Sequence, residues 1–273
     1  MRLYDAHNHL HDLRLAPHLD RIVQDLEQAP LAAMVVNGTH RGDWEGVVAA
    51  SSRIPGAIPA FGVHPWFLDS LQDGWVDDLM EYLETHNAPI GEIGIDFWKD
   101  GIDRDLQESV FRRQLDLARV RNLPVTIHGL KAWSRLLDIL RERPSLPAGF
   151  LLHSYAGPEE LVKPFADLGG YFSCSGAALH PKREKLLKLF AFIPEDRLLI
   201  ESDAPDQLPP PTADLSNLTD TANGDRLTHP LSIVTTYTRL AMERGVTLNE
   251  LTESVERNFH RLFGRFVTPV RQA

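Results

Sequence analysis

The stretch LYDAHNHL, residues 3–10, ends a short apolar strand-like segment with two histidines. In an extended chain, residues i and i+2 point to the same face, so His7 and His9 would direct two imidazoles toward one point. Such a pair would bind a metal ion with two ligands whose positions are fixed by the strand. Whether it does so depends on whether the rest of the chain supplies the other ligands.

The composition is that of an ordinary globular protein. The chain has 273 residues, of which 43% are hydrophobic and 24% are charged. Barrels of this length fold as one domain, so we expect a single domain over residues 1–273. The net charge of −10 argues against a general nucleic-acid coat protein but leaves room for a local basic groove. The lone Cys174 excludes an internal disulfide.

The N-terminal residues and the hydropathy of the chain predict a cytoplasmic protein with no membrane partner. The opening MRLYDAHNHL lacks an apolar signal segment. No apolar run approaches the roughly 18 residues that a membrane span needs.

Strand-like stretches recur along the chain with helix-like stretches between them. The strand-like stretches are RLYDAH (2–7), LAAMVVNG (31–38), AIPAFGVHP (57–65), APIGEIGID (88–96), LPVTIHG (123–129), GFLLHSY (149–155), GGYFSCSG (169–176) and DRLLIESDAP (196–205). Several are nearly continuous apolar runs, as expected for parallel strands that are buried on both faces.

Two helices are predicted with defined boundaries. Residues 103–122 place Leu106, Val110, Phe111, Leu115 and Ala118 at helical intervals. Residues 247–264 begin with a capping box of Thr247 and Glu250, carry a stripe of Leu251, Val255 and Phe259, and reach a plausible stop at Gly264.

The unusual polar residues fall where strands are expected to end. They are His7, His9, Asn37, His64, Glu92, His128, His153, Ser173, Ser175 and Asp203. This repeat of strand, polar residue and helix is typical of a TIM-type (β/α)8 barrel, an α/β fold whose chemistry lies at the carboxyl ends of its strands. An open doubly wound sheet is the alternative, but no G-x-G-x-x-G follows the first strand.

Residues 205–230 form a long Pro-, Asp-, Asn- and Thr-rich stretch after the eighth strand. We expect it on the active face, without the composition to bury a core. Loops of this length are either surface excursions or substrate lids, and the sequence leaves both interpretations open.

Six of the polar residues are good ligands for divalent metals: His7, His9, Glu92, His128, His153 and Asp203. Any one of these histidines alone is more often structural, but the complete set would be a costly group of buried charges without metal. Six ligands exceed one tetrahedral site and suit two metals, an arrangement used in phosphoester hydrolysis. Glu92 is the candidate bridge, and Asp203 is the candidate acceptor of a water proton.

The chain resembles the TatD-related metal-dependent hydrolases within the amidohydrolase-like barrels. The motifs DAHNHL, GVHP, GEIGID, PVTIHG, HSYAG and ESDAP occur in that family's order, from residue 4 to about residue 264. The resemblance implies one or two divalent metals and phosphodiester hydrolysis, most often of DNA. It assigns His7, His9 and Asp203 to one metal, His128 and His153 to the other, and Glu92 between them. It also implies that His64 contacts the phosphate of the substrate.

Two departures from the family pattern fall where substrate should bind. Lys131 in HGLKAW is the nearest cation where many members have Arg, and Lys lacks the bidentate fork. In DRLTHP, Thr228 stands where the family usually has Asn, and Arg226 would partly substitute. We therefore assign Lys131 and Arg226 to substrate binding.

A protein that binds nucleic acid is expected to carry a basic patch and exposed aromatic side chains. The run HPKREKLLK, residues 180–188, is more simply a solvated helix face. Trp66 and Trp98 follow strand motifs, where a ring either completes the core or stacks on a base.

The sequence predicts a metal-dependent phosphodiesterase, a deoxyribonuclease of exonuclease type that uses Zn, Mn or Mg. One alternative is an amidohydrolase acting on a small C–N or ester substrate. A second is a barrel subunit that mainly serves a larger complex, although the intact ligand set speaks against it.

Overall fold

Eight parallel strands alternate with helices in the computed structural model, which describes residues 1–142, 145–214 and 217–267. The strands are β1 (Leu3–Asn8), β2 (Leu31–Asn37), β3 (Ala57–Ala60), β4 (Ile90–Asp96), β5 (Val125–Leu130), β6 (Phe150–Leu152), β7 (Gly170–Cys174) and β8 (Leu198–Ile200). Each lies within, or within one residue of, a predicted stretch, so the predicted strand pattern is confirmed.

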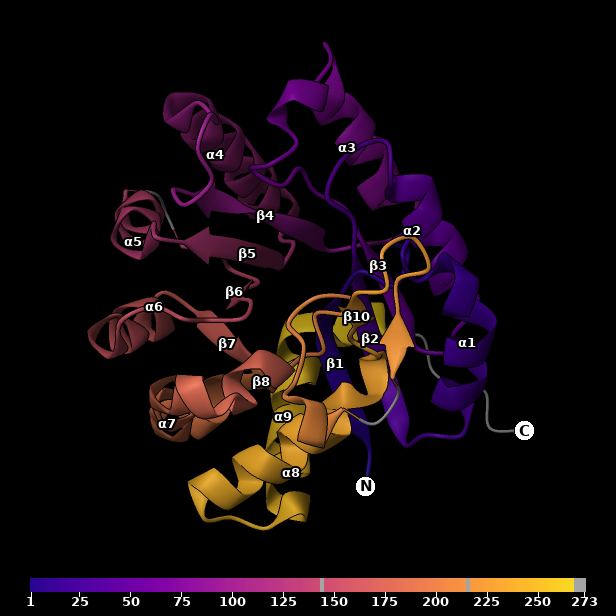
Figure 1. Ribbon diagram of the computed structural model, residues 1–273. Coiled ribbons are helices and arrows are strands. Elements are labelled where there is room, and N and C mark those ends of the chain that lie inside the picture. Colours follow the sequence, from indigo (N-terminus) through magenta and orange to yellow (C-terminus); the bar gives the residue numbers. More distant parts are fainter. Residues whose placement is uncertain (143–144, 215–216, 268–273) are drawn as a thin grey trace.

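The helices that follow the strands are α1 (Leu19–Glu27), α2 (Trp44–Ser51), α3 (Trp75–Thr85), α4 (Arg104–Arg121), α5 (Trp133–Arg141), α6 (Val162–Asp167), α7 (Glu184–Phe192), α8 (Ile233–Arg244) and α9 (Leu248–Phe263). Figure 1 shows α4 to α7 outside the strands on one side of the molecule and α1 to α3 on the other. The predicted α/β barrel is therefore confirmed. None of the described helices is both long and apolar enough to span a membrane.

The ring of strands consists of two parallel sheets that meet at two junctions. Strands β1 to β3 form one sheet and β4 to β8 form the other. At the first junction, Phe61 pairs with Ile90. At the second, the His9 amide donates to the Ala204 carbonyl (2.7 Å) and the Asp203 amide donates to the His7 carbonyl (2.9 Å). The second junction thus brings the first strand of the chain beside the last.

Strand β1 shows how the sequence divides between the two faces of the ring. Tyr4 points outward, where its ring packs against Phe259 of α9 at a centroid distance of 4.9 Å. Asp5 and His7 occupy the alternate positions, and both are buried. The period-2 pattern of the strand therefore directs Tyr4 to the helices and Asp5 and His7 to the interior.

The two predicted helices are confirmed, and so is the capping box predicted for the second. The Asp103 side chain accepts hydrogen bonds at the start of α4, and Asn122 ends the helix in left-handed backbone. Thr247 and Glu250 form the predicted capping box of α9. One detail was wrong, because Leu106 does not join the buried stripe of α4 and is 40% exposed.

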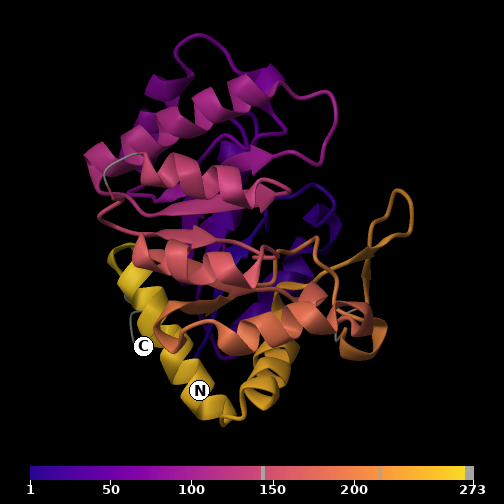
Figure 2. The ribbon, with the colours of Figure 1, turned by 90° about the vertical axis from the view of Figure 1, so that its left-hand side faces the viewer.

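The stretch 205–230 is more ordered than its composition predicts. It contains a short antiparallel hairpin of β9 (Leu218–Thr219) and β10 (Arg226–Leu227), which Figure 2 shows projecting from the barrel. Leu218 and Leu227 are nearly fully buried, so the expectation that this stretch buries no core was wrong. The hairpin lies over the segment that follows β1, where His18 Nε2 is 2.8 Å from the Thr219 carbonyl.

Candidate metal centre

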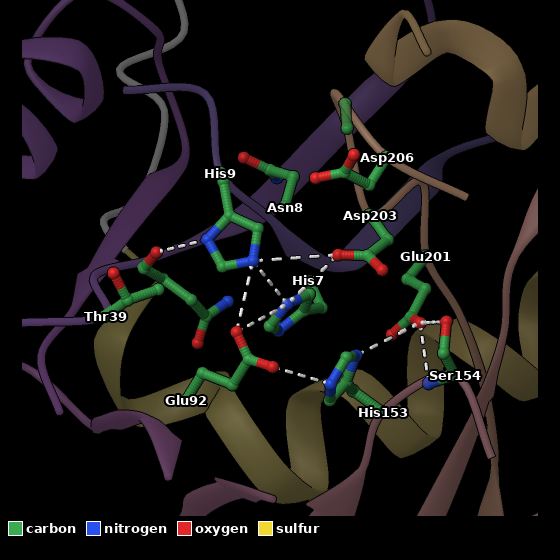
Figure 3. Close-up of polar contacts among 12 residues, drawn as sticks. His7, Asn8, His9, Thr39, Glu92, His153, Ser154, Glu201, Asp203 and Asp206 are labelled. Atoms are coloured by element: carbon green, nitrogen blue, oxygen red, sulfur yellow. Dashed lines mark hydrogen bonds and ion pairs between the residues drawn. The ribbon is translucent and has the colours of Figure 1, made fainter. Parts of the chain in front are cut away.

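The two histidines of the opening strand meet an acid from the last strand. His7 Nε2 lies 3.1 Å from His9 Nε2. Asp203 Oδ1 lies 3.3 Å from His7 Nε2 and 3.7 Å from His9 Nε2 (Figure 3). The junction that closes the ring therefore places these three side chains together.

The carboxylate of Glu92 lies between two sets of histidines. Its Oε2 is 3.2 Å from His9 Nε2 and 3.7 Å from His7 Nε2. Its Oε1 is 2.8 Å from His153 Nε2 and 3.0 Å from His128 Nδ1. One oxygen thus faces His7 of β1 and His9 directly after that strand, and the other faces His128 of β5 and His153 directly after β6. This is the arrangement that a bridging carboxylate needs.

All six predicted ligand residues converge at this centre. Three groups each bring their ligand atoms within 4.8 Å of one another: His7, His153 and Asp203; His7, His9 and Glu92; and His64, Glu92 and His128. These groups overlap through His7 and Glu92, so they do not divide the ligands into the two sets that the family resemblance implies. That division stays a prediction.

Two of the ligands do not lie at strand ends as predicted. Glu92 and His128 are interior residues of β4 and β5, whose strands continue to Asp96 and Leu130. Gly94, with φ of 152°, is paired in register with His128. A β-carbon at Gly94 would lie 2.0 Å from the His128 carbonyl oxygen. Glycine at this position therefore lets the two strands approach and sets Glu92 beside His128.

Backbone and carboxylate partners fix the tautomers of two ligands. His9 Nδ1 lies 2.7 Å from the Asn37 carbonyl, which can only accept, so this nitrogen carries the proton. In neutral His9 the Nε2 lone pair then faces Glu92 and Asp203. In the same way, His128 Nε2 lies 3.1 Å from Asp96 Oδ2 and leaves the Nδ1 lone pair facing Glu92. Such outer partners typically orient metal-binding histidines.

His64 differs from His9 and His128 in turning a proton, and not a lone pair, toward the centre. Its Nδ1 accepts a hydrogen bond from the Trp66 amide (3.1 Å), so the proton of neutral His64 is on Nε2. That nitrogen lies 3.4 Å from Glu92 Oε1. Burial lowers the pKa of His64 to about 4, and the charge of Glu92 only partly opposes this effect. His64 therefore presents a neutral N–H donor at the edge of the centre.

The centre is an electrostatically coupled group in which charges decide the pKa values. Burial alone would raise the pKa of Glu92, but its electrostatic interactions with His64 and His153, and its hydrogen bonds to His128 and His153, hold it well below its usual range. Burial raises the pKa of Asp203 to about 6, although His153 and His9 lower it in part. Burial would lower the pKa of His9, yet the hydrogen bond and charge of Glu92 raise it to about 9.

Three further buried acids support the ligands, and the sequence reasoning missed them. Asp5 Oδ2 accepts from the Ser202 hydroxyl (2.6 Å), and Asp96 holds His128. Glu201 Oε1 accepts from the Ser154 amide (2.7 Å) and lies 3.7 Å from His153 Nδ1. A period-2 signal was available for Asp5 and Asp96, because they stand two residues from His7 and four residues from Glu92 on the same faces of β1 and β4.

The two cations predicted to bind substrate lie outside this cluster. Lys131 is exposed and has left-handed backbone at the end of β5. Arg226 donates to Asp214 Oδ2 at 2.5 Å within the hairpin region. The structure records no contact of either with the six ligands among the described residues, so their assigned roles stay predictions.

The donor set fits divalent metal ions. His9 and His128 each turn one ring nitrogen toward the centre, because the other nitrogen is held by the Asn37 carbonyl or the Asp96 carboxylate. The buried carboxylates of Glu92 and Asp203 add negative charge. Imidazole and carboxylate together suit Zn, Mn and related ions. The residues that would hold such ions are His7, His9, Glu92, His128, His153 and Asp203.

Comparisons with known proteins agree with this geometry. The family model described as TatD related DNase matches residues 4–264. The Bacillus subtilis protein named "Uncharacterized metal-dependent hydrolase YabD" is 26% identical, with 96% of this chain and 98% of that protein covered. The Erwinia tasmaniensis protein named "3'-5' ssDNA/RNA exonuclease TatD" is 27% identical, with 96% of this chain and 99% of that protein covered.

A solved structure supports the fold independently. The crystal structure of YjjV, a TatD homologue from Escherichia coli, aligns with a TM-score of 0.84 and 24% identity, covering 96% of this chain and 98% of that chain. With a family match over nearly the whole length and a full-length barrel that carries its ligand set, the chain belongs to the TatD-related DNase family of metal-dependent hydrolases.

Proposed function

We propose that this protein is a metal-dependent phosphodiesterase that trims the ends of DNA. The observation that carries the proposal is the placement of Glu92, whose two carboxylate oxygens face separate sets of histidines at 2.8–3.2 Å. A carboxylate in this position suits a pair of metals, which hydrolyse phosphoesters by clamping the attacking and the leaving oxygen.

Two residues of the chain, Asp203 and His64, have separate roles in the proposed reaction. Metal ions held at the centre would supply Lewis acidity and a nucleophile at neutral pH. Asp203 Oδ1, beside His7 and His9, is placed to take a proton from the attacking water. The Nε2–H of His64 donates to a phosphate oxygen and stabilises the charge that develops on it.

The choice of DNA rests on the relatives. The Erwinia tasmaniensis protein is named an exonuclease of single-stranded DNA and RNA, and a mouse relative is named a putative deoxyribonuclease. Both names describe those proteins, and they support nucleic acid as the substrate class here.

A small C–N or ester substrate is the second candidate. It is favoured by the pairing of Arg226 with Asp214, which engages one of the two cations assigned to a phosphate-rich substrate. The net charge of −10 favours it as well.

The test is a panel of Zn, Mn and Mg with single-stranded DNA, duplex DNA, a simple phosphodiester and a small amide. Wild-type protein should cleave the phosphodiesters in a metal-dependent manner, and Asp203→Asn should lower kcat by about a thousandfold, within the range for loss of a general base. Asp206→Asn is the matched control, because that acid stands on the same loop but pairs with Arg14 on the surface. Hydrolysis of the amide alone, or equal activity of Asp203→Asn and wild type, would overturn the proposal.

A further inference from the structure

Beside the metal centre lies a tryptophan whose ring is partly open to solvent. Trp66 is 39% exposed, although its ring centroid is only 5.2 Å from that of His64 and 6.1 Å from that of His128. A large aromatic side chain so close to buried ligands would ordinarily be covered. Its exposed surface is therefore available to a molecule that enters the centre.

Trp66 is held in place by the same groups that orient the metal ligands. Its indole N–H donates to Asp96 Oδ2 at 2.7 Å, the oxygen that also holds His128 Nε2. Its backbone amide donates to His64 Nδ1. The ring is therefore a fixed surface with a set position relative to the hydrolytic centre.

The ammonium group of Lys99 lies over this ring. Lys99 is exposed, and its Nζ lies 4.5 Å from the centroid of the Trp66 ring. The Lys99 backbone amide donates to Asp96 Oδ1 at 3.0 Å, so a change of side-chain rotamer is enough to uncover the ring. A cation–π contact at an exposed site is weak, and a flat ligand can replace it.

We propose that Trp66 and Lys99 form a subsite for one unpaired nucleobase and its adjoining phosphate. The base stacks on the indole, as bases do on aromatic side chains in sequence-tolerant single-strand binding. The displaced Lys99 ammonium turns to the phosphate as a point charge. This subsite rests on the proposed function and specifies it, because a small amide would have no use for a flat aromatic surface beside a cation.

Two esters that release the same leaving group test the subsite. Thymidine 5′-(4-nitrophenyl phosphate) carries a base, and methyl 4-nitrophenyl phosphate does not, so the ratio of their kcat/KM values isolates the contribution of the nucleoside. Trp66→Leu should lower this ratio about tenfold, which lies within the range measured for loss of a base–aromatic stack. Trp66→Phe keeps a flat ring but loses the N–H donor, so it should hold the ratio within about twofold even where both rates fall.

Phe192→Leu is the matched control, because Phe192 is a 70% exposed aromatic residue on α7 and should leave the ratio unchanged. An unchanged ratio in Trp66→Leu, or an equal fall in Trp66→Phe and Trp66→Leu, would overturn the subsite.

The role of Lys99 has its own measurement. Lys99→Gln should reduce the slope of log affinity for oligothymidylate against log salt by about one, whereas Lys163→Gln, which removes a surface lysine paired with Asp167, should not. An unchanged slope in Lys99→Gln would remove Lys99 from the subsite.

Failure of the proposed function would be distinct from failure of the subsite. If neither ester is hydrolysed with any metal, equilibrium binding of thymidine 5′-monophosphate still decides the question. Affinity about tenfold weaker in Trp66→Leu than in wild type supports the subsite, and equal affinity overturns it.

Discussion

At the residue scale, the chemistry of each histidine is set by the partner of its second nitrogen. His9 Nδ1 donates a hydrogen bond to the Asn37 carbonyl, so neutral His9 turns the lone pair of Nε2 toward the centre. His64 Nδ1 accepts a hydrogen bond from the Trp66 amide, so neutral His64 turns its Nε2–H toward the centre. The sequence allowed a functional role to be predicted for both. It could not assign their tautomers, because Asn37 and Trp66 meet these rings only after the strands assemble.

The tautomers predict different effects of two alanine variants. His9→Ala should lose metal, because it removes a ligand lone pair. His64→Ala should keep the wild-type metal content and lose about a hundredfold in kcat/KM, the lower end of the effect of one charge-stabilising donor. Metal content is measured by elemental analysis of the purified proteins, together with kinetics on a simple phosphodiester. Equal loss of metal from both variants would show that His64 is a ligand.

At the element scale, two side chains of α4 hydrogen-bond to backbone beside the centre, one directly before His64 and one at the end of β4. Gln114 exchanges two hydrogen bonds with the backbone of Val63 (2.8 and 3.0 Å), directly before His64. Gln107 makes the same pair with the backbone of Asp96 (2.8 and 3.0 Å). The sequence predicted this helix and most of its apolar stripe. The burial of the two glutamines was not predicted, although their spacing of seven places them on the buried face beside Val110.

Gln114→Leu should destabilise the protein by about 3 kcal/mol, because it leaves the buried N–H and C=O of Val63 without partners. Gln24→Leu on the exposed face of α1 is the control and should change stability by less than about 0.5 kcal/mol. Urea unfolding of metal-free samples measures both. A loss in Gln114→Leu no larger than in the control would contradict this role of α4.

A buried histidine caps the short 3-10 helix that precedes α8, and it should make the fold sensitive to acid. Burial lowers the pKa of His229 to about 4 from 6.5, despite the nearby charge of Asp25. The unfolded chain therefore binds more protons than the folded one between pH 6.5 and 4, so stability present above pH 6.5 is lost as the pH falls. The loss is on the order of 3 kcal/mol at most.

His229→Asn retains an acceptor for the Leu231 amide but does not titrate in this range. Between pH 6.5 and pH 4, the free energy of unfolding of the wild type should fall, relative to that of this variant, by up to that amount. Unfolding curves at several pH values measure it, and parallel pH profiles for the two proteins would refute the assignment.

At the scale of the whole molecule, the barrel was predictable because its signal repeats. Eight apolar stretches, each followed by polar residues, indicated a ring of parallel strands with a site at one end. The hairpin of residues 218–227 was not predictable, since its two buried leucines stand in a stretch whose composition is otherwise that of a loop. Their burial depends on the surface that the rest of the barrel provides.

Metal should stabilise the whole barrel, because its ligands come from five different strands and are assembled only in the folded state. At free metal a hundredfold above the dissociation constant, binding adds about 2.7 kcal/mol to the stability. For a protein of this size the melting temperature should then rise by about 5 °C. Scanning calorimetry with chelator and with added metal measures the shift, and identical melting temperatures would argue against binding at this centre.

The junction between β1 and β8 has a consequence for how activity would be lost. Ring closure there uses the amides of His9 and Asp203, and the side chains of the same two residues belong to the ligand set. A local opening of this junction would separate the ligands while most helices and strands stay formed. The hydrogen-exchange rates of those two amides are therefore a direct measure of how often the folded protein visits an inactive form.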